Sequence, residues 1–393
     1  MFFSNLTTQL RKNVREYGMY IVLFVIMAIF TITTEGTFIS SRNIANLMNQ
    51  VGYIVVLAVG MTLVIVIRHI DLSVGFLSGF IGALCALAMK YWGLPVYIII
   101  PMSLGIGAVA GLIVGYLVAE VQIPAFVATL AGWMIYRGAI LLALIKDGTV
   151  ITSDEAFNAI GNGYIPDLPD MGFLPEVHKL TLLLGLLAII AFIIGQVHDR
   201  KTKKAYRFEV LPMDMFILKL IVMSILLGLI TWVLAGYNGL SWTLVIVLIV
   251  VFIFDFIATR TVLGRHIYAV GGNPEAATLS GIDVKKVTYF VFGSMGALAG
   301  LCGILFASRL RSATPTAGNM FEMDAIAAAY VGGVSAAGGV GKITGSFIGA
   351  LVMISLTSGM NLMGLDISFQ YIVRGAILVI AVIFDVFTRN RAL

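Results

Sequence analysis

The sequence predicts an all-α membrane protein, a bundle of about 12 transmembrane helices, from its composition and from the spacing of its apolar runs. Hydrophobic residues make up 60% of the chain and charged residues only 11%, whereas a soluble domain carries roughly 25% charged residues. The mean hydropathy is +1.02, and apolar runs recur at lengths near the roughly 20 residues that cross a bilayer as a helix. A water-soluble enzyme is therefore excluded. The net charge of +5 is assigned to loops rather than to a nucleic-acid partner.

Apolar runs between polar stretches define the expected spans. We expect about 10 to 12 of them, because the two short glycine-rich runs near the C-terminus allow one to be re-entrant. The runs are 19–33, 51–67, 73–89, 94–118, 126–145, 179–197, 215–235, 241–258, 288–307, 323–340, 345–360 and 370–386.

Positive charge predicts the orientation of these spans. With both termini cytoplasmic and twelve crossings, 16 of the 25 Lys and Arg residues lie in cytoplasmic loops, six lie in external loops and three lie within spans. This asymmetry follows the positive-inside rule. The resulting organisation is a cytoplasmic segment 1–18, a transmembrane domain 19–386 and a cytoplasmic tail 387–393.

Three loops stand out under this topology. The external loop 146–178 is polar and acidic, which suits contact with a partner or substrate. The cytoplasmic loop 198–213 is a basic patch, interpreted as a topological and lipid-facing element. The cytoplasmic loop 259–287 carries the most specific motif of the chain. Because no soluble domain is expected, energised work requires an ion gradient or another subunit.

No catalytic or cofactor site is expected in the chain. Cys85 and Cys302 lie within apolar runs, where cysteine behaves as a small hydrophobic residue. The four histidines show no metal-ligand spacing. The glycine-rich stretch 338–344 fails as a phosphate-binding loop, because Ala336 stands where glycine is needed and Ile343 stands where Ser or Thr is needed. ATP hydrolysis is therefore expected on a different subunit.

A short helix outside the bilayer is predicted near residues 273–281. Asn273 is a favoured N-cap and Pro274 suits the first helical position. Glu275 places a negative charge at the positive end of the helix, and Gly281 can close it in the left-handed conformation. These capping signals alone are equally compatible with a simple connecting helix between two spans.

The residues of this loop resemble a known family. Glu275-Ala276-Ala277 followed by Gly281 matches the E-A-A-x-x-x-G signature of the cytoplasmic loop in ABC importer permeases. The longer stretch from Gly264-Arg265 to Ile282 resembles the bacterial permeases for ribose, galactose, xylose and related monosaccharides. Three further motifs fit the same group: I-D-L-S-V-G (70–75), I-P-A-F-V-A-T-L-A-G (123–132) and E-M-D-A-I-A-A (322–328).

The resemblance implies a function and a set of partners. It implies the translocation subunit of an ATP-driven sugar importer in the bacterial inner membrane, paired as a homodimer. ABC ATPase subunits would bind on the cytoplasmic face, and an extracytoplasmic sugar-binding protein would deliver the monosaccharide. The residues that it assigns to ATPase coupling are Gly264, Arg265, Asn273, Glu275, Ala276, Ala277 and Gly281.

One departure bears on the substrate. Ribose-type permeases are shorter between the equivalent of Asp147 and the Gly264-Arg265 motif, where this chain has three spans. The extra pair that flanks the basic loop resembles the xylose or multiple-monosaccharide permeases. A related permease for another small solute, such as a nucleoside or a signalling furanone, is the alternative within this class.

Polar residues near or within spans are the candidate pathway or gate. Arg137 and Arg374 share the local sequence R-G-A-I-L on spans of opposite direction, which suggests a diverged inverted repeat. Snorkelling or carboxylate pairing also accounts for these arginines, and helix capping also accounts for Asp324. Asp71 and Ser73 are expected at the start of one span, and Asn319, Glu322 and Asp324 at the outer end of another. The candidates are Asp71, Ser73, Arg137, Asn319, Glu322, Asp324 and Arg374.

The rival from a different class is an ion-coupled secondary transporter. Such a protein needs a relay of carboxylates inside the membrane. The sequence predicts almost no acidic residues in the cores of the spans, and the helix at 273–281 would then have no purpose. A membrane enzyme is a third alternative, but no cluster of His, Ser, Cys or Asp is expected at one membrane depth.

Overall fold

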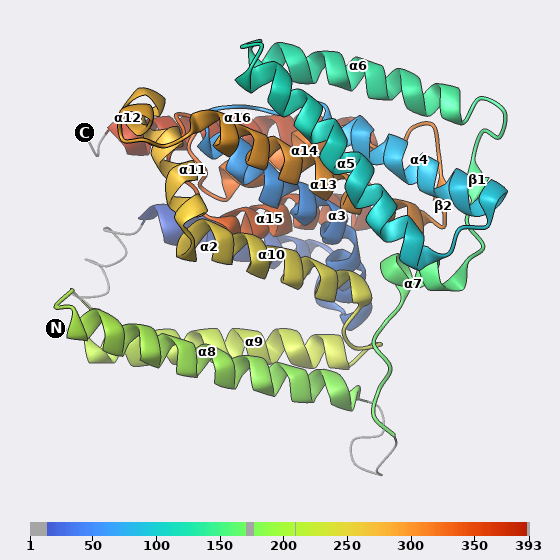
Figure 1. The fold of residues 1–393 in the computed structure, drawn as a ribbon. Helices are drawn as coiled ribbons and strands as arrows, with labels where there is room; N and C mark the ends of the chain where they lie inside the picture. Colours follow the sequence, from blue (N-terminus) through green and yellow to red (C-terminus); the bar gives the residue numbers. More distant parts are fainter. Residues whose placement is uncertain (1–13, 170–176, 209, 391–393) are drawn as a thin grey trace.

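Helices form nearly all of the structure. The computed structural model describes residues 14–169, 177–208 and 210–390 (Figure 1). Within these residues, ten helices are long and apolar enough to cross a membrane. They are α3 (Ser41–Val66), α4 (Val74–Trp92), α5 (Val96–Ala119), α6 (Ala125–Ala143), α8 (Lys179–Ala205), α9 (Met213–Ala235), α10 (Trp242–Arg260), α13 (Val284–Leu310), α15 (Ile343–Leu362) and α16 (Ile367–Asn390). The prediction of an all-α polytopic bundle is confirmed.

The two ends of the bundle carry different short elements. One end, called the α7 end, carries α7 (Glu155–Asn162) and an antiparallel pair of two-residue strands, β1 (Val150–Ile151) and β2 (Ser312–Ala313). The opposite end, called the α12 end, carries α11 (Val262–Gly272) and α12 (Pro274–Leu279) (Figure 1). The charge asymmetry of the sequence assigns the α12 end to the cytoplasm.

The first and last described helices both meet the α12 end. α2 (Val14–Thr33) has a shorter apolar stretch and is followed by the single turn η1 (Thr37–Ile39) at the other end. Met19 near the start of α2 lies beside Tyr268 of α11 at one cavity. Near the end of α16, Asp385 Oδ2 accepts a hydrogen bond from Ser335 Oγ at 3.0 Å. An even number of crossings requires this arrangement.

Helices α3 and α13 form the centre of the bundle. In the apolar window of α3 89% of the residues are buried, and in that of α13 72%. Gly107 of α5 and Gly296 of α13 face each other so closely that a Cβ on either would overlap the other's carbonyl oxygen. Small residues thus let these two backbones approach, as is usual where helices pack within a membrane.

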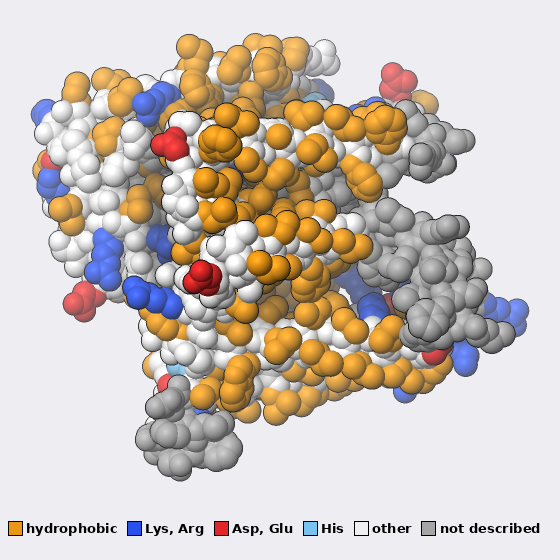
Figure 2. All heavy atoms as spheres, turned by 180° about the vertical axis from the view of Figure 1, so that it is seen from behind, with side chains coloured by type: hydrophobic (Ala, Val, Ile, Leu, Met, Phe, Trp, Pro, Cys, Tyr) orange, Lys and Arg blue, Asp and Glu red, His pale blue; other side chains and the backbone are white. Residues whose placement is uncertain are grey.

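Helices α8 and α9 form a hairpin at the edge of the bundle (Figure 1). Only 6% of the window of each helix is buried, so nearly all of their apolar side chains are left for lipid. Figure 2 shows hydrophobic side chains over the middle of the back face, with most Lys and Arg side chains toward its two edges. This is the surface expected of a membrane-embedded bundle.

The expected span 323–340 is not one helix, and that part of the topology is corrected. α14 (Phe321–Val331) has 11 residues, which is about 16 Å of helix and too short to cross a bilayer alone. The chain nevertheless crosses between α13, which ends at the α7 end, and α15, which begins at the α12 end. It does so with β2 and the non-helical residues 314–320 for the first part and α14 for the rest. Residues 332–342 then turn at the α12 end.

A second non-helical segment enters the bundle from the opposite side. Residues 67–73 join α3 to α4 and extend inward from the α12 end. His69 packs on Phe292 with ring centroids 5.9 Å apart, and Phe292 lies eight residues into α13, roughly 12 Å from its start. Thr129, in the second turn of α6, donates to Ile70 O at 3.3 Å. Asp71 and Ser73 are therefore held inside the bundle.

Candidate functional site

The two non-helical segments meet between α4 and α14. Gly318 packs on Gly75 so closely that a Cβ on Gly318 would overlap Gly75 O, and Gly318 has φ +85°, a conformation that favours glycine. The N-terminus of α4 and the N-terminus of α14 are thereby brought side by side within the bundle. The residues around this contact, Asp71, Ser73, Trp133, Arg137 and Glu322, are called the central polar cluster.

Asp71 caps the start of α4 from within the bundle. It is 2% exposed. Its Oδ1 accepts hydrogen bonds from the backbone N–H of Ser73 at 2.9 Å and from the Ser73 hydroxyl at 2.6 Å. A carboxylate in this position is stabilised by the free N–H groups and by the positive dipole end of the helix.

Glu322, in the first turn of α14, is also 2% exposed. Its Oε1 accepts a hydrogen bond from Trp133 Nε1 at 3.1 Å, while its Oε2 has no hydrogen-bond partner among the described residues. That oxygen occupies the space where Gly75, in the first turn of α4, would carry a Cβ. Each of two helix N-termini is therefore accompanied by a buried carboxylate, whose negative charge is stabilised by the positive end of a helix.

Arg137 of α6 connects the cluster to the segment entering from the α7 end. Its Nη1 donates to Pro315 O at 2.7 Å, and its guanidinium lies 5.0 Å from the centroid of the Phe76 ring. Backbone carbonyl and ring-face contacts both stabilise an arginine that is removed from water. Arg137 holds the non-helical residues 314–320 against α6.

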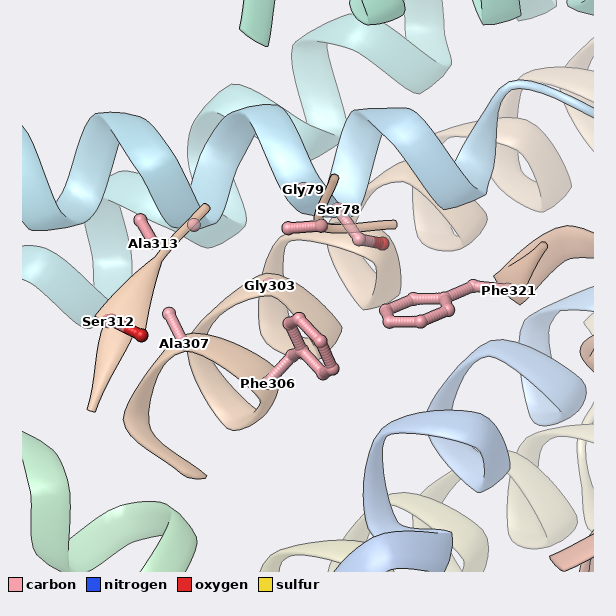
Figure 3. Close-up of a pocket in the computed structure, with 10 residues that line it drawn as sticks. Ser78, Gly79, Gly303, Phe306, Ala307, Ser312, Ala313 and Phe321 are labelled. Carbon is pink, nitrogen blue, oxygen red and sulfur yellow. The ribbon is translucent and has the colours of Figure 1, made fainter. Parts of the chain in front are cut away.

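A small cavity lies next to the cluster, between α4, α13 and β2 (Figure 3). Its volume of about 10 Å³ is that of roughly one water molecule. Figure 3 shows the rings of Phe306 and Phe321 close together on one side of it, with the Ser78 hydroxyl nearby. The two ring centroids are 4.8 Å apart, and Tyr53 of α3 packs on both rings. These three aromatic rings close the bundle at this level.

Asp324 and Arg374 form a second polar site, on the other side of α14. Arg374 Nη1 lies 3.2 Å from both carboxylate oxygens of Asp324, and Arg374 Nη2 donates to Thr357 Oγ1 at 2.8 Å. This side chain therefore ties α16 to α14 and to α15. Asp324 lies in the first turn of α14, at the positive helix end as expected, but α14 begins after Met320 without a side-chain cap. The carboxylate pairing considered for Arg374 is confirmed, since its partner is Asp324.

The structure regroups the predicted pathway residues. Asp71 and Ser73 were expected at one membrane face and Glu322 at the other, but all three lie together inside the bundle. Asp324 pairs with Arg374, whereas Asn319 is exposed on the entering segment. None of these acids lies in one of the ten span-capable helices, but Asp71, Glu322 and Asp324 are held within the bundle by the broken segments.

Two residues of these sites were missed by sequence analysis. Trp133 supplies a hydrogen bond to Glu322, and Tyr53 supplies the ring that covers Phe306 and Phe321. A tryptophan and a tyrosine within apolar spans are a usable signal, since each carries a polar group that needs a partner when buried.

The helix predicted at 273–281 is present as α12. Asn273 Oδ1 accepts a hydrogen bond from the backbone N–H of Ala276 at 3.1 Å, Pro274 is the first helical residue, and Gly281 has φ +81°. Gly264 lies in the first turn of α11 and packs on the end of α10, where a Cβ would overlap the carbonyl oxygens of residues 257 and 258. Arg265, Glu275 and Ala276 are exposed.

The exposed face of α12 differs from the one expected. Ala277 is 3% exposed and packs into the core of the bundle, so it cannot offer its side chain to another protein. Leu279 is 90% exposed. The exposed apolar residue of α12 is therefore Leu279, which was not among the predicted coupling residues.

The external loop is attached to the segment that leads into the central polar cluster. β1 pairs with β2, and Asn162 Nδ2 donates to Ser308 O at 2.8 Å at the end of α13. Elsewhere in the loop, hydrogen bonds from Lys90 and from Tyr91, the latter at 2.9 Å, lower the pKa of Asp147. The exposed acids of this surface include Asp154 and Glu155.

Comparisons with known proteins place the chain in a family. A family model described as the permease component of the branched-chain amino acid transport system matches residues 43–382. The chain belongs to this permease family. No solved structure matches the permease.

Curated relatives cover this permease from end to end. The xylose transport system permease protein XylH of Haemophilus influenzae is 35% identical over 96% of the chain and 98% of the relative. The protein of the same name from Escherichia coli is 37% identical over 97% and 94%. The ribose import permease protein RbsC of Haemophilus influenzae is 33% identical over 96% and 95%. These relatives agree with the resemblance seen in the four sequence motifs.

Proposed function

We propose that this permease imports a monosaccharide, with xylose or a similar pentose as the favoured substrate, as the membrane subunit of an ATP-driven importer. The full-length similarity to permeases named for xylose and ribose carries the proposal. The hairpin of α8 and α9 favours the xylose group over the ribose group. A nucleoside or a furanone is the alternative substrate class within the same mechanism.

The transporter works with partners at both ends of the bundle. An ATPase subunit binds the α12 end in the cytoplasm, where α12 offers exposed Leu279, Glu275 and Ala276. A sugar-binding protein docks on the acidic α7 end. The subunit pairs with a second copy of itself in the bacterial plasma membrane and has no ATP site of its own.

The sugar route runs past the two polar sites. Sugars present hydroxyl groups, so a route needs sparse hydrogen-bonding side chains that do not hold the solute tightly. The central polar cluster and the Asp324–Arg374 pair lie on opposite sides of α14, and the rings of Tyr53, Phe306 and Phe321 lie beside the same helix. In the closed bundle the aromatic rings block passage, and movement of α14 relative to α13 opens it.

The α12 assignment is tested at Leu279. Leu279→Glu is expected to leave membrane insertion unchanged and to reduce co-purification of the ATPase at least tenfold, because a charge replaces the exposed apolar side chain. Phe208→Glu is the matched control, since Phe208 is a 66% exposed apolar residue near the same end of the bundle that is not assigned to coupling.

Leu279→Glu and Phe208→Glu distinguish an ATPase-binding role of α12 from that of a simple connecting helix. Equal recovery of the ATPase with wild type, Leu279→Glu and Phe208→Glu would show that α12 is a simple connecting helix. Ala277→Trp serves a different purpose, because Ala277 is buried and the larger ring disturbs the packing of α12 on its own bundle. We expect that variant to insert poorly.

A further inference from the structure

Arg68 joins α11 to the start of the segment that enters the bundle. This residue follows α3 with φ +68°. Its Nε donates to Gly271 O at 2.7 Å and its Nη2 donates to Gly272 O. A planar guanidinium can donate to two successive carbonyl groups at once, whereas an ammonium group offers no such fixed pair of donors. The end of α11, directly before α12, is thus bonded to residue 68.

Two glycines, Gly271 and Gly338, allow close packing around Arg68. A Cβ on Gly271 would overlap Val66 O, and a Cβ on Gly338 would overlap the side chain of Arg68. Gly339 N donates to Val66 O at 2.8 Å. The end of α3, the end of α11 and the turn after α14 therefore meet at one point, which is called the Arg68 joint.

Two chain segments connect the Arg68 joint to the central polar cluster. In one direction the chain runs from Arg68 to Asp71 and Ser73 in five residues, without a helix that would absorb a displacement. In the other direction the turn 332–342 follows α14, which carries Glu322. Tyr268 of α11 also donates to Gly341 O at 2.7 Å in that turn. A displacement of α11 would therefore move both carboxylates of the cluster, those of Asp71 and Glu322.

We propose that the Arg68 joint transmits movement of α11 and α12 to the central polar cluster, so that Arg68 is a positioning residue for coupling ATP hydrolysis to opening of the sugar route. The proposal rests on the function proposed above. It adds the mechanical link between the ATPase-facing helix and the helix N-termini inside the bundle, because Ser73, directly before α4, lies five residues from Arg68.

The test uses the reconstituted complex of permease, ATPase and binding protein in proteoliposomes. Arg68→Lys keeps the charge but not the paired donors, and Arg68→Gly keeps the left-handed backbone without a side chain. Both variants are expected to assemble and to keep basal ATPase activity within about twofold of wild type. Stimulation of the ATPase by sugar-loaded binding protein, and sugar uptake, are expected to fall at least tenfold. Arg260→Lys and Arg260→Gly, at an exposed arginine at the end of α10, are the matched controls and should behave as wild type.

Gly338→Ala provides a second test that leaves Arg68 in place. The added methyl group overlaps Arg68 Cγ and should produce the same uncoupling. Normal stimulation and uptake in the Arg68 variants overturn the proposal, and so does loss of assembly in all three variants, which would show that the joint only holds the fold together. If the ATPase fails to bind even the wild-type chain, the proposed function fails instead.

Discussion

Two carboxylates inside the bundle are explained by the helix ends beside them. Asp71 is bonded to Ser73 at the start of α4, and Glu322 lies in the first turn of α14 against Gly75. An isolated charge in hydrocarbon is costly. Asp71 is compensated by two hydrogen bonds from Ser73 and Glu322 by one from Trp133, and both lie at positive helix ends. The Oε2 of Glu322 has no hydrogen-bond partner among the described residues.

The packing of Gly75 against Glu322 is directly testable. Gly75→Ala is expected to lower the thermal midpoint of the purified permease and to abolish uptake, because the methyl group overlaps Glu322 Oε2, and overpacking costs about 1–3 kcal/mol. The double variant Gly75→Ala/Glu322→Ala should regain part of the lost stability. Gly105→Ala is the control, since that position faces open space, and its midpoint should stay at the wild-type value. An equal effect at both glycines would contradict the assigned contact.

The Asp324–Arg374 pair gives a second prediction at the residue scale. Removing one partner of a fully buried ion pair costs about 3–5 kcal/mol, and side-chain exposures of 21% and 19% put this pair below that range. Asp324→Asn and Arg374→Gln should each lower stability and reduce uptake at least tenfold. The double variant should lose less stability than the sum of the two, because no uncompensated charge remains.

Thr357→Val isolates the weaker bond of the same site. It removes only the neutral partner of Arg374, and we expect a loss of about 1 kcal/mol with uptake retained. The coupling of the two charges is measured by thermal denaturation of the Asp324→Asn/Arg374→Gln double variant. If its loss of stability equals the sum of the two single losses, the charges do not interact.

For single helices, the sequence predicts features that depend on neighbouring residues, such as helix caps, but not features that depend on tertiary packing. α12 was predicted because Asn273, Pro274 and Gly281 lie within one short segment and act locally. The burial of Ala277 was not predicted, because it depends on how α12 packs on the bundle. The break in the crossing that contains α14 was not predicted, because residues 323–340 form a continuous apolar and glycine-rich run.

The meeting of Asp71 with Glu322 could not be deduced from the sequence either. The two residues are about 250 positions apart, and hydropathy places each at the end of an apolar run, which normally means a membrane face. Only the entry of residues 67–73 and 314–320 from opposite ends brings them to one depth. A non-helical backbone at that depth is permitted because it is buried in protein.

The hairpin of α8 and α9 is separable from the rest by its geometry. His178 N donates to Ala235 O at 2.9 Å, so the chain enters and leaves the hairpin at adjacent points. We expect a variant in which a short Gly-Ser linker replaces Lys179–Ala235 to insert and to bind the ATPase, because removing two crossings preserves the direction of all others. An impermeant thiol reagent should then label a cysteine at Glu155 from outside and spare one at Lys286. Labelling at Lys286 would show that the hairpin sets the topology.

At the scale of the whole molecule, two units of the same element order run in opposite directions. The first is α3, the segment 67–73, α4, α5 and α6; the second is α13, the residues after it, α14, α15 and α16. Each opening helix is followed by an arginine with positive φ, Arg68 at +68° and Arg311 at +51°. Each unit ends on a helix with the sequence R-G-A-I-L, at Arg137 and Arg374. The inverted repeat suggested by those five residues is therefore matched by the order and direction of the helices.

Such an arrangement suits alternating access. In transporters built from inverted repeats, sites at the repeat interface lie near the membrane midplane and the two units rock about them. Here the central polar cluster lies where the broken segments of the two units meet, with Asp71 and Ser73 directly before α4 and Glu322 at the start of α14. α11 is attached to the end of α3 and α7 to the end of α13, so each unit carries one short helix at the end of its opening helix.

Uptake of labelled xylose by proteoliposomes containing the permease and its ATPase distinguishes an ATP-driven importer from an ion-coupled transporter. We expect uptake that requires ATP on the α12 side and binding protein on the α7 side, and that continues when proton and sodium gradients are collapsed. Xylose uptake driven by an imposed proton or sodium gradient in the absence of ATP would contradict it, and would identify the buried carboxylates as an ion relay instead.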